Sequence, residues 1–152
     1  MLSCMALYQL TAAKIQRLIA NKQLRAGEIV EAFARRIDKV EKDVGALVNR
    51  TIDRAYAQAE MIDKLVDTGS PLPPLAGVPI VIKDNLALAD YPMTCGSKIL
   101  KDYIPPYDAT VCEKLSRAGA LIIGKTNMDE FAMGSSNENS AFYPAKNPWD
   151  LS

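Results

Sequence analysis

Apolar residues recur every three or four positions through the first half of the chain, a spacing that predicts amphipathic helices. Thr11 is a good N-cap for the first helix, and the second is expected over about 28–42. A short strand candidate at 46–48 precedes a third helix over about 52–66. The residues expected to face the core from these helices are Ile15, Leu18, Ile19, Ile29, Val30, Phe33, Ile37, Val40, Ala55, Ala59, Ile62 and Val66.

The pattern changes at 69–74, where a proline-dense connector cannot continue a helix and tends to stay extended. We expect a boundary there, with an amino-terminal helical segment over 1–70 and an α/β segment over 71–152. In the second segment, 78–82 predicts a buried strand that is apolar on both faces, and 120–123 predicts another buried strand.

A fourth helix is expected between these two strands. Asp108 would cap it and Gly119 would end it, with Val111, Leu115 and Ala118 on its inner side. The order strand, long connection, helix and strand is that of a βαβ-type unit. The sequence therefore predicts an α/β fold in which amino-terminal helices are followed by part of a mixed, mostly parallel sheet with flanking helices.

The charge balance and the hydropathy exclude several classes of partner. The 152 residues include 18 Lys plus Arg and 18 Asp plus Glu, so the net charge of zero gives no field for holding a phosphate backbone. No apolar run approaches the roughly 20 residues of a membrane helix. Lys14 and Arg17 interrupt the start before a signal-peptide core could form, and Met5 is a candidate for the natural start. We expect neither autonomous nucleic-acid binding, nor a membrane span, nor secretion.

The absence of histidine narrows the chemistry further. It removes the commonest general base and both the Ser–His and Cys–His nucleophile pairs. The three cysteines, Cys4, Cys95 and Cys112, form no Cys-x-x-Cys pair that could hold a metal or a redox disulfide. We interpret them as reduced thiols of a cytosolic, cytoplasmic protein, and we expect no metal or cofactor site in this chain.

Lys83 is the candidate for a base that replaces histidine. It follows five apolar positions at the carboxyl end of a strand, where α/β folds usually place their ligands. Burial disfavours an ammonium, so an enclosed lysine would offer a neutral amine as a base. The alternative is a strand-end lysine that reaches solvent or pairs with Asp84.

Three other segments carry weaker signals. The segment 134–140 is dense in small hydroxyl and amide groups, which suit a turn or a pocket wall equally. Residues 119–126 match the phosphate-loop pattern G-x-x-x-x-G-K-[ST], but their middle is an apolar strand, so we interpret the match as accidental. A turn that packs onto the sheet is the simplest interpretation of four apolar residues, Met128, Phe131, Ala132 and Met133.

Read together, several long motifs resemble the amidase signature family. They occupy 75–85, 105–111, 124–136 and 147–151, in that order. Within the family, the sequence Met-Asp-Glu-Phe-Ala-Met-Gly-Ser-Ser followed by 138–142 resembles the A subunits of glutamyl-tRNA(Gln) amidotransferases. The resemblance covers nearly the whole chain, the amino-terminal helices included.

The resemblance implies a glutaminase that releases ammonia from glutamine. The partner B and C subunits would use that ammonia to amidate glutamate on tRNA(Gln), with ATP and magnesium handled by the B subunit, through which the tRNA is mainly reached. In this family the chemistry rests on a lysine, a bridging serine in cis conformation and a second serine that attacks the amide. The lysine matches Lys83, which would take a proton from the bridging serine. Met133, Gly134 and Ser135 are implied to line the substrate pocket.

The two serines of the family have no match in this chain. The bridging serine belongs to a Gly-Gly-Ser-Ser-Gly-Gly segment, and Ser135, Ser136 and Ser152 do not stand in that context. We therefore expect an incomplete amidase signature fold, the truncated amino-terminal piece of such an A subunit, inactive on its own. Two alternatives stay open: a non-catalytic fragment that docks a partner chain, and part of an amidase that acts on small amides without tRNA.

Overall fold

The computed structural model describes residues 7–151. The expectations on Met1 or Met5 as the start, on Cys4 and on Ser152 lie outside these described residues. Within the described range, neither Cys95 nor Cys112 is in a disulfide bond, and the cytosolic location inferred from the cysteines stays a prediction. None of the helices in the same range has both the length and the apolar character needed to cross a membrane.

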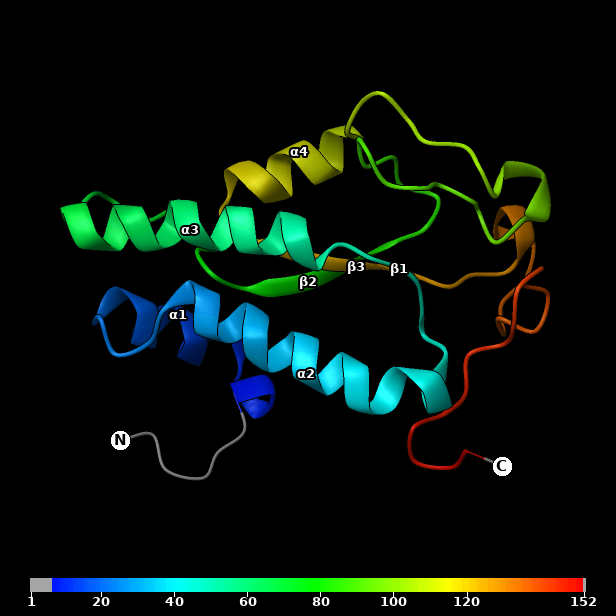
Figure 1. Ribbon diagram of the computed structural model, residues 1–152, viewed down its shortest axis with the longest axis horizontal. Coiled ribbons are helices and arrows are strands. Elements are labelled where there is room, and N and C mark those ends of the chain that lie inside the picture. Colours follow the sequence, from blue (N-terminus) through cyan, green and yellow to red (C-terminus); the bar gives the residue numbers. More distant parts are fainter. Residues whose placement is uncertain (1–6, 152) are drawn as a thin grey trace. The chain divides into compact units, whose positions relative to one another are not determined.

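The four predicted helices are present (Figure 1). Their bounds are Ala12–Ala20 for α1, Ala26–Val44 for α2, Ile52–Thr68 for α3 and Thr110–Arg117 for α4. The 3-10 turns η1, η2 and η3 cover Leu7–Gln9, Lys98–Leu100 and Glu130–Ala132. Thr11 caps α1 as predicted, because its side chain accepts a hydrogen bond from the backbone N–H of Lys14 at 3.2 Å.

The periodicity predicts the inner faces of the first three helices correctly. In α4 the prediction is wrong for Val111, which is 43% exposed, because the inner stripe of this short helix runs through the buried Cys112 and the half-buried Leu115. Phe33 and Val40 on α2 are half-buried. The other predicted core positions of α1, α2 and α3 are buried, namely Ile15, Leu18, Ile19, Ile29, Val30, Ile37, Ala55, Ala59, Ile62 and Val66.

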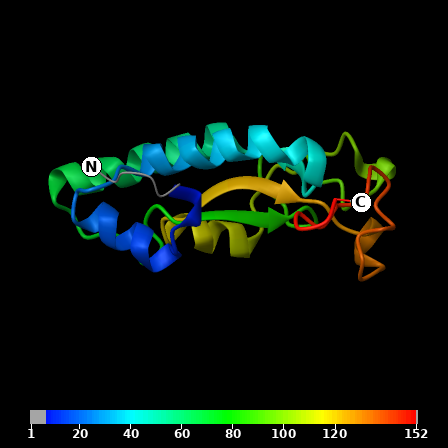
Figure 2. The same cartoon turned by 90° about the horizontal axis from the view of Figure 1, so that it is seen from below.

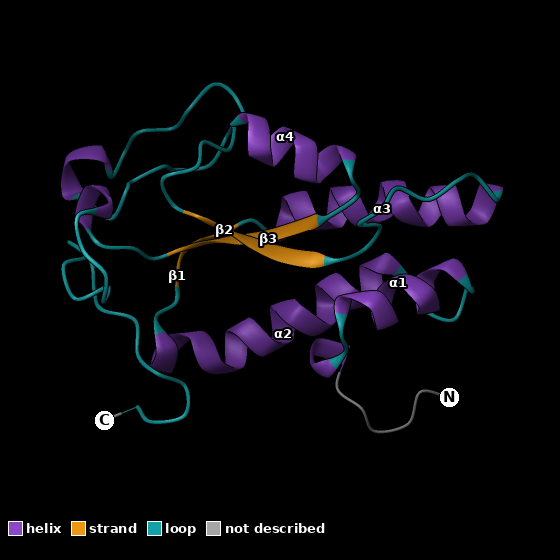
Figure 3. Cartoon of the chain, turned by 180° about the vertical axis from the view of Figure 1, so that it is seen from behind, coloured by secondary structure: helices purple, strands orange, loops and turns teal. Residues whose placement is uncertain are grey.

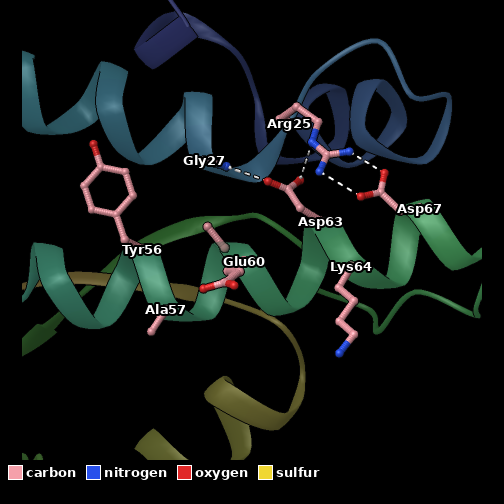
Figure 4. Close-up of a pocket in the computed structure, with 9 residues that line it drawn as sticks. Arg25, Gly27, Tyr56, Ala57, Glu60, Asp63, Lys64 and Asp67 are labelled. Atoms are coloured by element: carbon pink, nitrogen blue, oxygen red, sulfur yellow. Dashed lines mark hydrogen bonds and ion pairs between the residues drawn. The ribbon is translucent and has the colours of Figure 1, made fainter.

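The start of α2 is fixed by acidic side chains of α3 (Figure 4). The Asp63 carboxylate accepts hydrogen bonds from the backbone N–H groups of Ala26 and Gly27, at 2.8 and 3.2 Å. Arg25, just before the helix, lies 3.5 Å from Asp63 and donates to Asp67 at 3.0 Å. The free N–H groups and the positive end of the α2 dipole are thereby satisfied from a neighbouring helix.

The described strands form one small mixed sheet. Leu47–Arg50 is β1, Pro79–Lys83 is β2 and Leu121–Thr126 is β3, in the order β1-β3-β2. β1 pairs antiparallel with β3, whereas β2 and β3 lie side by side and point the same way (Figure 2). The parallel pair is the one joined through α4, so the predicted βαβ order and the mixed α/β class are confirmed.

The expectation that 78–82 is buried on both faces is wrong. Ile82 is buried, but Val81 is 45% exposed and Lys83 is exposed. Alternate residues of a strand face opposite sides, and the side that carries Val81 and Lys83 is not covered by the described chain. By contrast, β3 is buried at every position from Leu121 to Lys125.

The chain divides into two compact units, each built from separate stretches of sequence. Unit 1 comprises 1–37, 52–80 and 114–123, and unit 2 comprises 38–51, 81–113 and 124–152. Unit 1 holds most of the helical core, and unit 2 consists largely of loops, drawn in teal in Figure 3. The division after residue 70 that the sequence predicts stays a prediction.

Candidate functional site

A cavity at the end of β2 brings distant parts of the sequence together. Its volume is about 390 Å³, and every residue that lines it belongs to unit 2. Of the residues predicted for a site, Lys83, Gly134 and Ser135 line it. The other lining residues are Thr126, Asn127, Met128, Asp129, Ala132, Ser136 and Asn137.

Lys83 occupies the last position of β2, as predicted, but it is not enclosed. Its side chain is exposed, so the expectation of an enclosed lysine is wrong and Lys83 reaches solvent. Its role as a base stays a prediction. The carboxylate of Asp84 pairs with another lysine, Lys125, at 3.1 Å. The backbone at this point is held by a hydrogen bond from the N–H of Asp84 to the carbonyl of Thr126, at 3.1 Å.

Met133 does not join the cavity. Its side chain is 72% exposed, and Phe131 beside it is 41% exposed. The interpretation of this segment as a turn packed onto the sheet is therefore wrong for these two residues and right only for Met128, which is 3% exposed. Phe131 and Ala132 both have positive φ angles, 52° and 61°, which turns the chain sharply and keeps their side chains off the regular helical face.

The wall that faces Lys83 is organised by Asp129. Its carboxylate accepts hydrogen bonds from the backbone N–H groups of Asn139 and Asn137, at 2.8 and 3.0 Å. These bonds favour the ionised form, so the amides of Asn139 and Asn137 lower the pKa of the Asp129 carboxyl below its ordinary value. Gly134 lies against the same carboxylate, and the loop that carries Ser135 and Ser136 is thus held around one buried charge.

Asn137 gives the wall a hydrogen-bond donor with no partner. Its side-chain oxygen accepts a hydrogen bond from the N–H of Ala145 at 2.5 Å, which fixes the orientation of the amide. Its Nδ2 is buried and has no hydrogen-bond partner within residues 7–151. With the amine of Lys83 and the hydroxyl of Ser135, the cavity offers donors for a carbonyl or carboxylate oxygen. The hydroxyl of Ser136 already donates to the carboxylate of Glu138 at 2.9 Å.

The buried lysine of the chain is one that the sequence reasoning passed over. Lys125 is fully buried in β3, where it pairs with Asp84 and donates to the carbonyl of Pro92 at 2.6 Å. Burial lowers the pKa of Lys125, and the charge of Asp84 opposes that shift. The strand was expected to stop at Ile123, but it continues through the supposed phosphate-loop residues, so that match is accidental as interpreted. The missed signal was a lysine two residues after an apolar run, separated from it only by Gly124.

A larger cavity lies in unit 1, between the start of α2 and α3 (Figure 4). Its volume is about 640 Å³, and it contains none of the predicted site residues. Arg25, Asp63 and Asp67 on its wall already pair with one another, so they serve the helix start described above. Along residues 7–151 there is no cluster of three His, Cys, Asp or Glu side chains that could hold a metal ion.

The fold and this cavity define a class of protein: an α/β protein in which a strand-end amine faces a loop rich in hydroxyl and amide groups. The family model for Amidase matches residues 28–152, so the chain belongs to the amidase signature family. Two curated relatives are A subunits of glutamyl-tRNA(Gln) amidotransferase. That of Desulforudis audaxviator is 50% identical over 146 residues, and that of Carboxydothermus hydrogenoformans is 51% identical over 147 residues.

The chain spans 30% of the length of these relatives, which cover 96% and 97% of it. Among solved structures it resembles a bacterial aryl acylamidase of the amidase signature family, with a TM-score of 0.87 and 30% identity. That match covers 93% of this chain and 30% of the other. It also resembles the A subunit of the Thermotoga maritima glutamyl-tRNA(Gln) amidotransferase, with a TM-score of 0.71 and 30% identity over 95% of this chain and 28% of the other.

Proposed function

We propose that this chain forms the lysine-bearing part of the glutamine-hydrolysing subunit of a tRNA-dependent amidotransferase. The observation that carries the proposal is that Lys83, Gly134, Ser135 and Ser136 line the same cavity. In the proposed reaction, Lys83 takes a proton from a serine that activates the nucleophile, and the wall orients the carboxamide of glutamine. The relatives at about 50% identity bear the name of that subunit.

The exposure of Lys83 is compatible with this role. A base must reach the proton that it accepts, and an amine at a strand end can do so from the open side of β2. Since no Gly-Gly-Ser-Ser-Gly-Gly segment occurs in the chain, neither serine of the family's mechanism is matched here. We therefore expect no glutamine hydrolysis by these 152 residues alone.

The proposed partners are the B and C subunits of the same amidotransferase. Ammonia released from glutamine would pass to the B subunit, which would use ATP and magnesium to amidate glutamate carried on tRNA(Gln). The net charge of zero agrees with a protein that does not grip the tRNA by itself. Neither Cys95 nor Cys112 is in a disulfide bond, which agrees with the cytosol as the proposed place of this reaction.

A chimera tests the proposal. The chain replaces the matching segment of the Carboxydothermus hydrogenoformans A subunit, which is assembled with its own B and C subunits. We expect the complex to hydrolyse glutamine and to amidate Glu-tRNA(Gln). Lys83→Met should lower the rate of glutamine hydrolysis by about 100-fold or more, the scale of a lost general base.

Two controls make the result specific. Lys64→Met removes an exposed lysine of α3 outside the Lys83 cavity and should leave glutamine hydrolysis unchanged. Ammonium chloride in place of glutamine bypasses the first reaction, so the Lys83→Met chimera should still amidate Glu-tRNA(Gln). Full glutamine hydrolysis by Lys83→Met would contradict the role of Lys83.

A second candidate is an amidase that acts on small amides without tRNA. It is favoured by one observation, the higher TM-score with the aryl acylamidase, 0.87 against 0.71. The same chimera distinguishes the two. Hydrolysis of an aryl amide such as 4-nitroacetanilide together with no hydrolysis of glutamine would favour the second candidate over the first.

A further inference from the structure

A buried ion pair is formed by Asp84 and Lys125, which are next in sequence to Lys83 and Thr126 of the cavity lining. Asp84 and Lys125 are both fully buried, and the carboxylate Oδ1 lies 3.1 Å from the ammonium nitrogen. Removing two charges from water costs free energy that their attraction need not repay, so such a pair is a poor source of stability. Its presence in the core calls for another explanation, because an apolar pair would fill the same space.

The pair ties both parallel strands to one loop. Asp84 follows Lys83 at the end of β2, and its Oδ2 accepts hydrogen bonds from the N–H and the hydroxyl of Thr94, at 2.9 and 2.5 Å. Lys125 on β3 donates to the carbonyl of Pro92 at 2.6 Å. The loop 92–97 is therefore held to the ends of β2 and β3 through buried charges.

The same loop supports the wall of the cavity. The carbonyl of Cys95 accepts a hydrogen bond from the N–H of Phe131 at 2.8 Å, and the hydroxyl of Ser97 donates to Glu130 at 2.6 Å. A β-carbon on Gly96 would lie 2.4 Å from the carbonyl oxygen of Met128, so the two backbones are in close contact. Any movement of this loop would therefore displace the segment that leads into Gly134.

We propose that the buried Asp84–Lys125 ion pair is a positioning device, which sets Lys83 at the correct place relative to the wall formed by Met128–Ser136. Asp84 directly follows Lys83, the last residue of β2, and its carboxylate is buried, whereas Lys83 is exposed and lines the cavity. The buried carboxylate therefore anchors the chain at the residue next to Lys83. The inference rests on the proposed function only for the role of Lys83 as a base. The contacts themselves are independent of it.

The arrangement of contacts on Asp84 suits this role. Its Oδ1 has no hydrogen bond of acceptable geometry within the described residues and is balanced by the charge of Lys125. Burial lowers the pKa of Lys125, and Asp84 opposes this shift, so the charge on Lys125 depends on its partner. The side chains of this one pair therefore hold the loop at two points, Pro92 and Thr94.

The test uses the full chain and a readout that does not depend on amide hydrolysis. The acylation rate of Lys83 by an N-hydroxysuccinimide ester is measured against pH by mass spectrometry, with the exposed Lys64 of α3 as the internal reference. The amide resonances of Gly134, Ser135 and Ser136 report on the wall. The variants are the double substitution Asp84→Asn/Lys125→Met, which leaves no unpaired charge, and Thr94→Val, which keeps both charges and removes one hydroxyl.

We expect the double variant to change the ratio of Lys83 to Lys64 acylation by about twofold or more at some pH, and to move the wall resonances. Thr94→Val should move the same resonances by less. Glu31→Gln, which breaks the exposed ion pair with Arg35, is the matched control and should change neither.

The proposal is overturned if either variant folds with an unchanged Lys83 profile and unchanged wall resonances. Thr94→Val decides the matter if the double variant does not fold, because it alters a single hydroxyl. A failure of this proposal can be told apart from a failure of the proposed function. Both readouts, the acylation of Lys83 and the amide resonances of the wall, can be measured on a chain that does not hydrolyse glutamine.

Discussion

A β-carbon on Gly134 would lie 2.5 Å from Cγ of Asp129 and 2.7 Å from its Oδ2. The loop can therefore wrap closely around this carboxylate only with glycine at position 134. That closeness lets one acidic side chain bind the amides of Asn137 and Asn139 beyond it. The wall of the cavity is thus shaped by a contact between two residues five positions apart.

Gly134→Ala should loosen this wall. The new methyl group must push away either the Asp129 side chain or the loop backbone, at a cost of order 1 kcal/mol. Hydrogen exchange at the amides of Asn137 and Asn139 should become faster. Gly27→Ala is the control, because the nearest atom to its β-carbon would be Asp63 Oδ2 at an ordinary 3.7 Å. Unchanged exchange in Gly134→Ala would show that the loop absorbs the methyl group.

Acid should release the same loop. Hydrogen bonds from Asn139 and Asn137 lower the pKa of the Asp129 carboxyl below its ordinary 3.8. The stabilisation is therefore complete above the unfolded value and is lost as the pH falls through the lower folded value. Exchange-corrected protection of these two amides should drop below pH 3.8 in the wild type. In Asp129→Asn it should be weak at every pH, and a wild-type level of protection in that variant would contradict the role of the charge.

Two lysine substitutions should differ sharply in their effect on stability. Lys83→Met alters an exposed side chain and should change the free energy of unfolding by less than about 0.5 kcal/mol. Lys125→Met leaves the buried Asp84 without its counter-charge and should cost about 3–5 kcal/mol. Urea unfolding followed by far-ultraviolet circular dichroism measures both. Equal losses would mean that the burial assigned to Lys125 is wrong.

The start of α2 offers a comparison between two aspartates of α3. Asp63→Ala removes the acceptor for the N–H groups of Ala26 and Gly27 and should destabilise the chain by about 1 kcal/mol. Asp67→Ala removes only an exposed ion pair with Arg25 and should cost roughly 0.5 kcal/mol or less. Thermal unfolding of the two variants shows which one loses more stability. A larger loss for Asp67→Ala would contradict the assignment of Asp63 as the residue that caps α2.

The exposed apolar residues give a prediction about association. Ile99, Ile104 and Tyr107 are 81%, 54% and 58% exposed, and Met133 and Trp149 are exposed as well. A chain with this much apolar surface should associate as its concentration rises. Light scattering on a concentration series should show growing particle mass, whereas a monodisperse, cooperatively melting monomer would count against it.

The local pattern was enough to predict the helices and the strands. Three-to-four spacing identified α1, α2 and α3, because a helix must bury one stripe wherever it packs. Thr11 identified the start of α1 through a contact three residues away. The parallel pair followed from the order strand, helix and strand, which admits few topologies.

Burial of individual strand residues was not predictable in the same way. The run 78–82 and the run 120–123 look alike as letters, yet only β3 is buried throughout. The difference arises because β3 is central in the order β1-β3-β2, while one face of β2 is left open by the described chain. A lysine was therefore expected to be buried at 83 and was found buried at 125.

The sequence by itself determined the elements and the family, and it selected Lys83, Gly134 and Ser135, which line one cavity, because each depends on local spacing or on motifs read in order. Only the tertiary structure decided that Asp84 pairs with Lys125, that Met133 is exposed and does not line the cavity, and that Asp129 accepts hydrogen bonds from the wall. Those outcomes depend on which strand is central in the sheet and which loop packs against it. Contacts between residues far apart in the sequence produce no periodic pattern along the chain, so the sequence alone does not predict them.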